Sequence, residues 1–150
     1  MVYKRDSYRT IKTDWKAQGK RNRARGADTE RRTKEDLEDD GWIVCKWNNN
    51  VKDDELVVVK NKFRGIGIPM MLGAGFPDFI AYRLKKRLYE IIGVEVKTSG
   101  ILDKEEKEKC VWLLKNKIFS KILIARRESS LLSKHISIEY KEFRSKTNGS

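Results

Sequence analysis

The sequence is poor in the residues that most often build catalytic and metal sites. Its 150 residues include one histidine, His135, and two cysteines, Cys45 and Cys110. A single histidine argues against a histidine-centred triad and against a metal site made of several histidines. The cysteines form no Cys-x-x-Cys motif, and we expect both to be reduced and partly buried. Any chemistry must therefore come from carboxylates, lysines, hydroxyls or the backbone.

Long hydrophobic runs are missing as well. No apolar stretch approaches the length of a membrane span. The N-terminal sequence MVYKRDSYRT lacks the apolar centre of a signal peptide. We therefore expect a cytoplasmic, intracellular protein with no membrane contact, and the chain length suits one domain with a modest core.

Positive charge is what the sequence has in excess. The formal net charge is +12 and the sequence pI is near 9.7. Because neutralised phosphates release counterions, this charge favours a polyanionic partner, and we expect nucleic acid. A ribosome-associated or simply basic protein is the alternative.

The charge is concentrated near the N-terminus. Residues 1–25 contain nine basic and two acidic residues, with Tyr3, Tyr8 and Trp15 between them. The segment lacks a clear apolar period, which favours a flexible arm or a loosely docked helix. An arm of this composition is suited to embrace a phosphate backbone and to stack on bases. The alternative is a solubilising tail.

A first helix is predicted directly after this arm. Asp28 or Thr29 is a suitable N-cap, and Gly41 is a suitable end. The helix is polar nearly all round, so we expect it on the surface. Its candidates for inward positions are Ala27, Thr33 and Leu37.

Apolar runs separated by turn-prone segments predict the strands. We expect a hairpin of strands 42–47 and 54–60 around Asn48–Asn50, followed by a mobile loop over 61–75. Further strands are expected at 77–83, 88–97, 120–127 and 135–140. A helix over 102–117 should be capped by Asp103, with Glu106 as the reciprocal partner.

This order of elements fits an α/β sandwich around a mixed sheet. We place the folded domain at residues 26–140. The basic arm 1–25 precedes it, and residues 141–150 form a C-terminal tail.

Asp78, Glu95 and Lys97 form the most specific chemical pattern in the chain. Side chains alternate along a strand, so Glu95 and Lys97 share one face, roughly 7 Å apart. Val94 and Val96 point the other way, into the core. A hairpin between the two predicted strands would set Asp78 beside them. Burying these charges without a purpose is costly, because desolvated charges need partners.

Two carboxylates and an ammonium suit phosphodiester hydrolysis. Asp78 and Glu95 would hold Mg²⁺, a hard ion that prefers oxygen ligands. Lys97 would contact the attacking water and the charge that develops on the phosphate. As a base, Lys97 would need a lowered pKa, which two nearby carboxylates oppose, so we expect an electrostatic and orienting role.

The bare pattern [DE]-x-K is common, and three further copies occur in this chain: Asp14/Lys16, Glu105/Lys107 and Glu139/Lys141. Only Glu95/Lys97 lies in an apolar strand that follows a Pro-Asp strand. The alternative for this pair is a structural salt bridge at a strand end.

The segments "GFPDFIAYR" and "GVEVKTSG" resemble the signature of the PD-(D/E)XK nuclease superfamily, with Pro77-Asp78 and Glu95-Val96-Lys97 in the matching places. The resemblance implies a restriction-endonuclease-like αβββαβ core and a DNA partner. It also implies Mg²⁺ as the cofactor, with Mn²⁺ as a substitute. A homodimer or higher homo-oligomer is implied as well.

The upstream segment "RGADTERR" is similar to the opening of archaeal Holliday-junction resolvases, with Gly26, Glu30 and Arg31 in the matching places. The resemblance implies that Glu30 is an accessory catalytic carboxylate and metal ligand. It further implies that the Val96 carbonyl completes the metal shell and that Thr98 assists phosphate contact. The chain departs from the resolvases in its basic arm, its more polar first helix and the glycine-rich insertion before Asp78.

Three functions remain open at this point. The first is a Mg²⁺-dependent endonuclease selective for junctions, flaps or other branched DNA in recombination, repair or replication. The second is a sequence-specific restriction or homing endonuclease on the same core, and the third is a non-catalytic nucleic-acid-binding module. The DNA-binding residues that we expect are Arg23, Arg25, Arg31, Lys62, Arg64 and Thr98.

Overall fold

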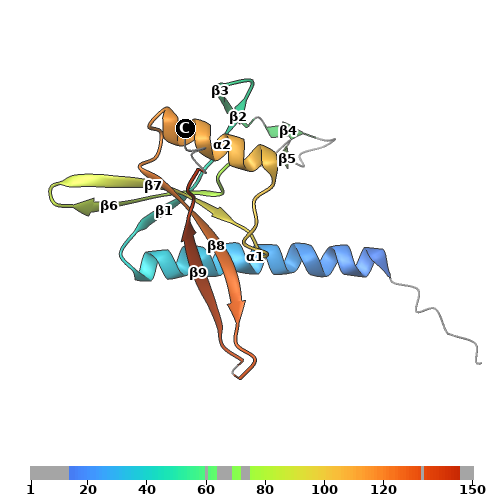
Figure 1. Cartoon of the computed structure of the whole chain (residues 1–150). Coiled ribbons are helices and arrows are strands. Elements are labelled where there is room, and N and C mark those ends of the chain that lie inside the picture. Colours follow the sequence, from blue (N-terminus) through green and yellow to red (C-terminus); the bar gives the residue numbers. More distant parts are fainter. Residues whose placement is uncertain (1–13, 60, 64–68, 72–74, 133, 146–150) are drawn as a thin grey trace, which may run out of the picture.

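The structure is a computed structural model that describes residues 14–59, 61–63, 69–71, 75–132 and 134–145. These residues form a mixed five-stranded sheet with helix α1 (Trp15–Asp39) on one face and helix α2 (Lys104–Lys115) on the other (Figure 1). The expected α/β class is confirmed at this level. Neither helix combines the length and apolar composition of a membrane span among the described residues.

The sheet is ordered β1-β6-β7-β8-β9. Its strands are β1 (Ile43–Lys46), β6 (Phe79–Lys85), β7 (Leu88–Val96), β8 (Lys121–Ser129) and β9 (Ile136–Glu142). β7 and β8 are parallel and are joined through α2, whereas the other neighbours are antiparallel. Each of these strands lies close to a predicted range. β9 extends two residues into the segment that we expected to be a tail.

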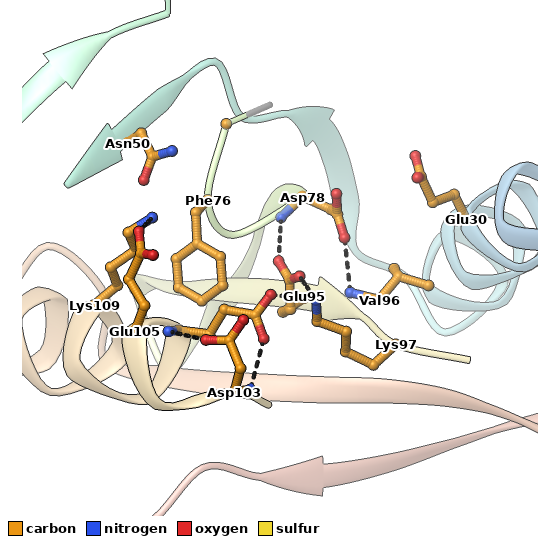
Figure 2. Close-up of a pocket in the computed structure, with 12 residues that line it drawn as sticks. Glu30, Asn50, Phe76, Asp78, Glu95, Val96, Lys97, Asp103, Glu105 and Lys109 are labelled. Carbon is orange, nitrogen blue, oxygen red and sulfur yellow. Dashed lines mark hydrogen bonds and ion pairs between the residues drawn. The ribbon is translucent and has the colours of Figure 1, made fainter. Parts of the chain in front are cut away.

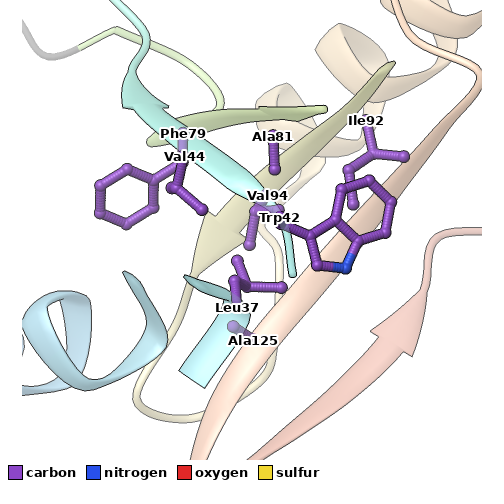
Figure 3. Packing of buried hydrophobic residues seen from close by; sticks show 8 residues of the cluster. All are labelled: Leu37, Trp42, Val44, Phe79, Ala81, Ile92, Val94 and Ala125. Atoms are coloured by element: carbon purple, nitrogen blue, oxygen red, sulfur yellow. The ribbon is translucent and has the colours of Figure 1, made fainter. Parts of the chain in front are cut away.

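The alternation of side chains along the strands divides the core into two layers. On the α1 face, Leu37 and Trp42 pack with Val44, Phe79, Ala81, Ile92, Val94 and Ala125 (Figure 3). On the α2 face, Cys110 and Leu113 pack with Phe119, Ile122 and Ile124. Complete burial of one such aliphatic side chain stabilises the fold by about 1.5–3 kcal/mol. The sheet is therefore held from both sides.

Helix α1 begins well before the position that the sequence indicated. The Asp14 carboxylate accepts hydrogen bonds from the backbone N–H groups of Lys16 and Ala17, each 3.1 Å long, and so caps the helix. The predicted N-cap at Asp28 or Thr29 is wrong, because these residues lie inside a continuous helix. Residues 15–25 of the expected arm are therefore helical, and residues 1–13 lie outside the described ranges.

The buried side of α1 consists of Thr29, Thr33 and Leu37 rather than Ala27, which is exposed. Both threonines can be buried because their hydroxyls donate to the helix backbone. Thr29 donates to the carbonyl of Arg25 and Thr33 to that of Thr29, each at 2.8 Å. The helix ends as expected before Gly41, whose φ of +85° suits glycine.

The predicted hairpin of strands 42–47 and 54–60 is wrong. β1 pairs with β6 instead, and a separate hairpin joins β2 (Asn49–Lys52) to β3 (Glu55–Val58). Its turn is Asp53-Asp54, with φ of 51° and 57°, a backbone region that aspartate tolerates better than most residues. Val44 of β1 is buried in the core on the α1 face, whereas no side chain of β3 is buried.

The glycine-rich segment 61–75 contains two short strands where we expected only a loop. β4 (Asn61–Phe63) pairs antiparallel with β5 (Pro69–Met71). The backbone of Lys62 therefore lies in a strand. Arg64 falls outside the described residues, so its predicted contact with DNA stays a prediction.

Candidate active site

Asp78 and Glu95 face each other at the end of the β6–β7 hairpin. Phe79 lies opposite Val94 in the antiparallel register, so the preceding Asp78 lies opposite Glu95. The Asp78 N–H donates to Glu95 Oε2 at 3.2 Å, and the Val96 N–H donates to Asp78 Oδ2 at 2.8 Å (Figure 2). The two side chains are 14% and 7% exposed. The expected convergence of these carboxylates is confirmed.

This carboxylate pair is electrostatically strained. Burial, and next the charge of Asp78, raises the pKa of Glu95 to about 8. Burial also raises the pKa of Asp78, although its hydrogen bond from the Val96 N–H acts in the opposite direction. Desolvation and a like charge both disfavour an ionised carboxylate. A cation bound between the two groups would relieve both costs.

Lys97 lies on the same side of the sheet as Glu95, as the alternation predicted. Its Nζ is 3.5 Å from Glu95 Oε1 and also forms an ion pair with Glu106. Burial disfavours the charged form of Lys97, but the hydrogen bond to Glu106 and the charge of Glu95 outweigh it, so the pKa of Lys97 is raised. Lys97 is therefore a cation, which fits an electrostatic role better than that of a general base.

Glu106 is a site residue that the sequence analysis missed. It was identified only as the partner of Asp103 in the capping box, and that box is present: Glu106 Oε2 accepts from the Asp103 N–H at 2.9 Å. Its other oxygen pairs with Lys97. One carboxylate thus connects the start of α2 to the candidate site. No local signal could have shown this second contact, because it depends on how α2 packs against the sheet.

Glu30 approaches the site from α1, as the resemblance implied, but its carboxylate turns to Lys46. Lys46 Nζ lies 2.7 Å from Glu30 Oε2 and 3.7 Å from Asp78 Oδ1, so it stands between the two acids. Lys46 was not among the expected site residues. Within the described ranges, no three cysteine, histidine, aspartate or glutamate residues are grouped as a metal site. The role of Glu30 as a metal ligand stays a prediction.

An open cavity of about 380 Å³ gives access to these groups. Its lining residues are Glu30, Asn50, Gly75, Phe76, Asp78, Glu95, Val96, Lys97, Asp103, Glu105, Glu106 and Lys109. Gly75 is required there by chain packing, since a Cβ atom would lie 1.9 Å from the Trp47 carbonyl oxygen. The cavity is wide and polar, which suits a charged, extended ligand better than a small apolar one.

The expected DNA-binding residues are distributed over several surfaces. Arg23 and Arg25 lie exposed on the first half of α1, and Thr98 is exposed just after β7. Arg31 is bound by Asp28 and Glu35 at 2.8 and 2.7 Å, so it is less available to a ligand.

Trp42 belongs to the core, with the Arg83 guanidinium 4.2 Å from its ring centre.

Comparison of the chain with protein-family models, curated proteins and solved structures found no match. The resemblance to PD-(D/E)XK nucleases therefore depends on the motif residues and stays a prediction. The fold itself is established as a mixed five-stranded sheet with helices on both faces.

Proposed function

We propose that this protein is a Mg²⁺-dependent endonuclease that hydrolyses DNA phosphodiester bonds. The observation that supports this most strongly is the opposed pair of buried Glu95 and partly buried Asp78, with Lys97 beside it. Three charged groups in one partly buried cluster are costly for stability alone. They are an appropriate set for binding a metal ion and a scissile phosphate.

The residues present fit a magnesium ion. Asp78 and Glu95 would hold it through carboxylate oxygens, and the Val96 carbonyl is the third protein donor that the motif suggests. Mg²⁺ retains several water molecules and is commonly bound by one or two carboxylates, so two acids suffice. When bound, the ion polarises the phosphate and lowers the pKa of a coordinated water. Glu30 would become an accessory ligand only after release from Lys46.

In this proposal, Lys97 orients the attacking water and stabilises the negative charge that develops on the phosphate. Its ammonium group lies beside Glu95 and attracts the negative charge that develops on a phosphate during hydrolysis. Glu106 acts through Lys97, because it holds the ammonium group and favours its charged form. Glu106 is thus a positioning residue, and its carboxylate also stabilises the start of α2.

Branched DNA is the proposed substrate class. The net charge of +12 favours a ligand with many phosphates, and the resemblance to junction resolvases favours junctions, flaps or related structures. Mapping of the cut sites on a plasmid separates this class from restriction and homing enzymes. Cleavage at one recognised sequence would favour the sequence-specific alternative.

Cleavage assays with junction, flap, single-stranded and duplex DNA, with and without Mg²⁺, test the proposal. We expect metal-dependent products, and a loss of about 100-fold or more for Asp78→Asn, Glu95→Gln and Lys97→Ala. Lys107→Ala is the matched control, because Glu105/Lys107 repeats the acid-x-lysine spacing and Lys107 is exposed. Lys107→Ala should cleave like the parent.

Two results would contradict the nuclease proposal. The first is cleavage that persists unchanged in the Asp78→Asn and Lys97→Ala variants, since the activity would then belong to a contaminant or to another site. The second is DNA binding that is equally tight without metal, with no product after long incubation. That second result would favour the non-catalytic nucleic-acid-binding module.

A further inference from the structure

The two halves of α1 have different surroundings. In the second half, Thr29, Thr33 and Leu37 pack against the sheet. The first half, residues 15–27, extends past the edge of the sheet (Figure 1), and none of its residues is buried. Trp15, at its start, is 79% exposed. The first half therefore contributes little to the core that holds the fold together.

The same division separates the charges of the helix. Residues 15–27 contain five basic residues and no acidic one, whereas residues 28–39 contain six acidic and three basic residues. In the second half, the basic side chains Arg31, Arg32 and Lys34 form ion pairs within the helix. The basic side chains of the first half form no ion pair with any described residue.

This arrangement opposes the helix dipole. Anionic groups are favourable in the first turn of a helix and cationic groups in the last, but α1 has no acidic residue in its first turn and no basic residue in its last. The isolated helix gains nothing from such a distribution. A polyanion lying along the first half would gain from it, because every charge there has the complementary sign.

Three of these cations form one stripe that leads to the candidate active site. Lys16, Lys20 and Arg23 follow the spacing i, i+4, i+7, and Glu30 lies seven residues further on the same side. Glu30 lines the cavity. At about 1.5 Å of rise per residue, Lys16 lies roughly 21 Å from Glu30 along the helix axis, which corresponds to about six base pairs of duplex.

We propose that the stripe of Lys16, Lys20 and Arg23 docks the sugar–phosphate backbone of a duplex arm that leads away from the cavity. The inference depends on the proposed function for its choice of DNA as the polyanion. It adds a length requirement, since an arm must extend about six base pairs beyond the cut to reach Lys16. The second half of α1 holds Glu30 at the cavity while the first half holds the arm.

Salt-dependent binding by the full chain tests the docking surface without any need for cleavage. The probe is a fluorescently labelled 20-base-pair duplex in EDTA, with the dissociation constant measured by anisotropy over a range of KCl concentrations. Each phosphate contact contributes about 0.9 to the slope of log K against log salt. We expect the triple variant Lys16→Gln, Lys20→Gln, Arg23→Gln to lower that slope by about 2 to 3.

Two further variants control for charge and for folding. Lys85→Gln, Lys86→Gln, Arg87→Gln removes the same charge from the turn between β6 and β7, at the opposite end of the molecule from residues 15–27 (Figure 1). This control should retain most of the slope. Lys16→Arg, Lys20→Arg, Arg23→Lys keeps the charges and should behave like the parent. Equal slopes for the glutamine stripe variant and the parent overturn the proposal, as does an equal loss in the β6–β7 variant.

The length of the DNA duplex provides a second test. Duplexes of 6 to about 20 base pairs should bind the parent progressively better, whereas the stripe variant should gain much less from the added length. Loss of slope in the stripe variant with no cleavage of any DNA would uphold the docking surface and reject the nuclease. Cleavage by the parent together with an unchanged slope in the stripe variant would uphold the nuclease and reject the docking surface.

Discussion

Two carboxylate sites are associated with opposite faces of the sheet. Their surroundings shift the carboxylate pKa in opposite directions. On the α1 side, Asp28 is surrounded by Arg31, Arg32 and Arg127 at 2.8 to 2.9 Å. Hydrogen bonds from Arg32 and Arg31 lower the pKa of Asp28 to about 2. On the α2 side, burial raises the pKa of both Asp78 and Glu95, and the charge of Asp78 raises the pKa of Glu95 further.

The difference distinguishes a structural carboxylate from a candidate functional one. Arg127 belongs to β8, so its pair with Asp28 ties α1 to the sheet. Asp78 and Glu95 accept hydrogen bonds within the β6–β7 hairpin, but burial disfavours the charged form of both. Carboxylates in a cavity whose charged form is disfavoured are typical of ligand sites, because a bound cation supplies additional positive charge. The predictions below test this contrast.

The largest expected effect is stabilisation by metal. At a Mg²⁺ concentration 100 times the dissociation constant, a single site raises the free energy of unfolding by about 2.7 kcal/mol. Glu95→Gln should lose this gain, and Asp28→Asn should keep it. Denaturant titrations with Mg²⁺ and with EDTA measure the difference. A gain that survives in Glu95→Gln would place the metal elsewhere.

Next in size is the effect of Glu95→Gln itself in metal-free buffer at pH 8. The substitution keeps an oxygen that can accept from the Asp78 N–H but removes the repulsion between two buried acids. We expect the free energy of unfolding to rise by about 1–2 kcal/mol. A large loss of stability would show that the Glu95 charge is already compensated, and the contrast with Asp28 would disappear.

Asp28→Asn should change the free energy of unfolding in the opposite direction and by a smaller amount. The folded state lowers the pKa of Asp28, so its charge stabilises the fold above the ordinary aspartate pKa of 3.8. That contribution is lost as the pH falls through about 2. The variant should therefore be less stable than the parent at pH 7, and the two should converge toward pH 2. Urea titrations at several pH values measure this; a constant gap down to pH 2 would exclude the charge as its cause.

The smallest effect on stability is expected for Glu106→Gln. Glutamine can replace glutamate in a capping box, so the free energy of unfolding should change by less than about 0.5 kcal/mol. Lys97 would nevertheless lose an anionic partner, and its pKa should fall. The pH profile of cleavage should therefore shift to lower pH on its alkaline side. An unshifted profile with normal stability would reject the positioning role.

Local sequence patterns were sufficient to predict features that involve residues close together in the sequence. The β6–β7 hairpin, the capping box of α2 and the shared face of Glu95 and Lys97 follow from alternation and turn chemistry. The start of α1 was missed because residues 1–25 lack a clear apolar period and Asp28 or Thr29 suited an N-cap. The helix instead begins with an N-cap at Asp14.

The remaining errors concern pairings between distant segments. β1 was assigned to a hairpin with the run at 54–60, since both are apolar and close in sequence, yet β1 joins β6. The contacts of Glu106 with Lys97 and of Lys46 with Glu30 also span separate elements. The turn-prone run Asn48–Asn50 suggested a local hairpin, whereas the packing of the whole sheet paired β1 with β6.

The sequence by itself determined which charged groups are available to the candidate site: acids and a lysine at alternating positions of apolar strands, in a strongly basic chain with a single histidine. The tertiary structure decided which of these charges are compensated. Asp28 meets three arginines, one of them from β8, whereas Asp78 and Glu95 meet each other. Strand periodicity is encoded within a few residues, but the partner of a charge depends on which distant elements the core brings together.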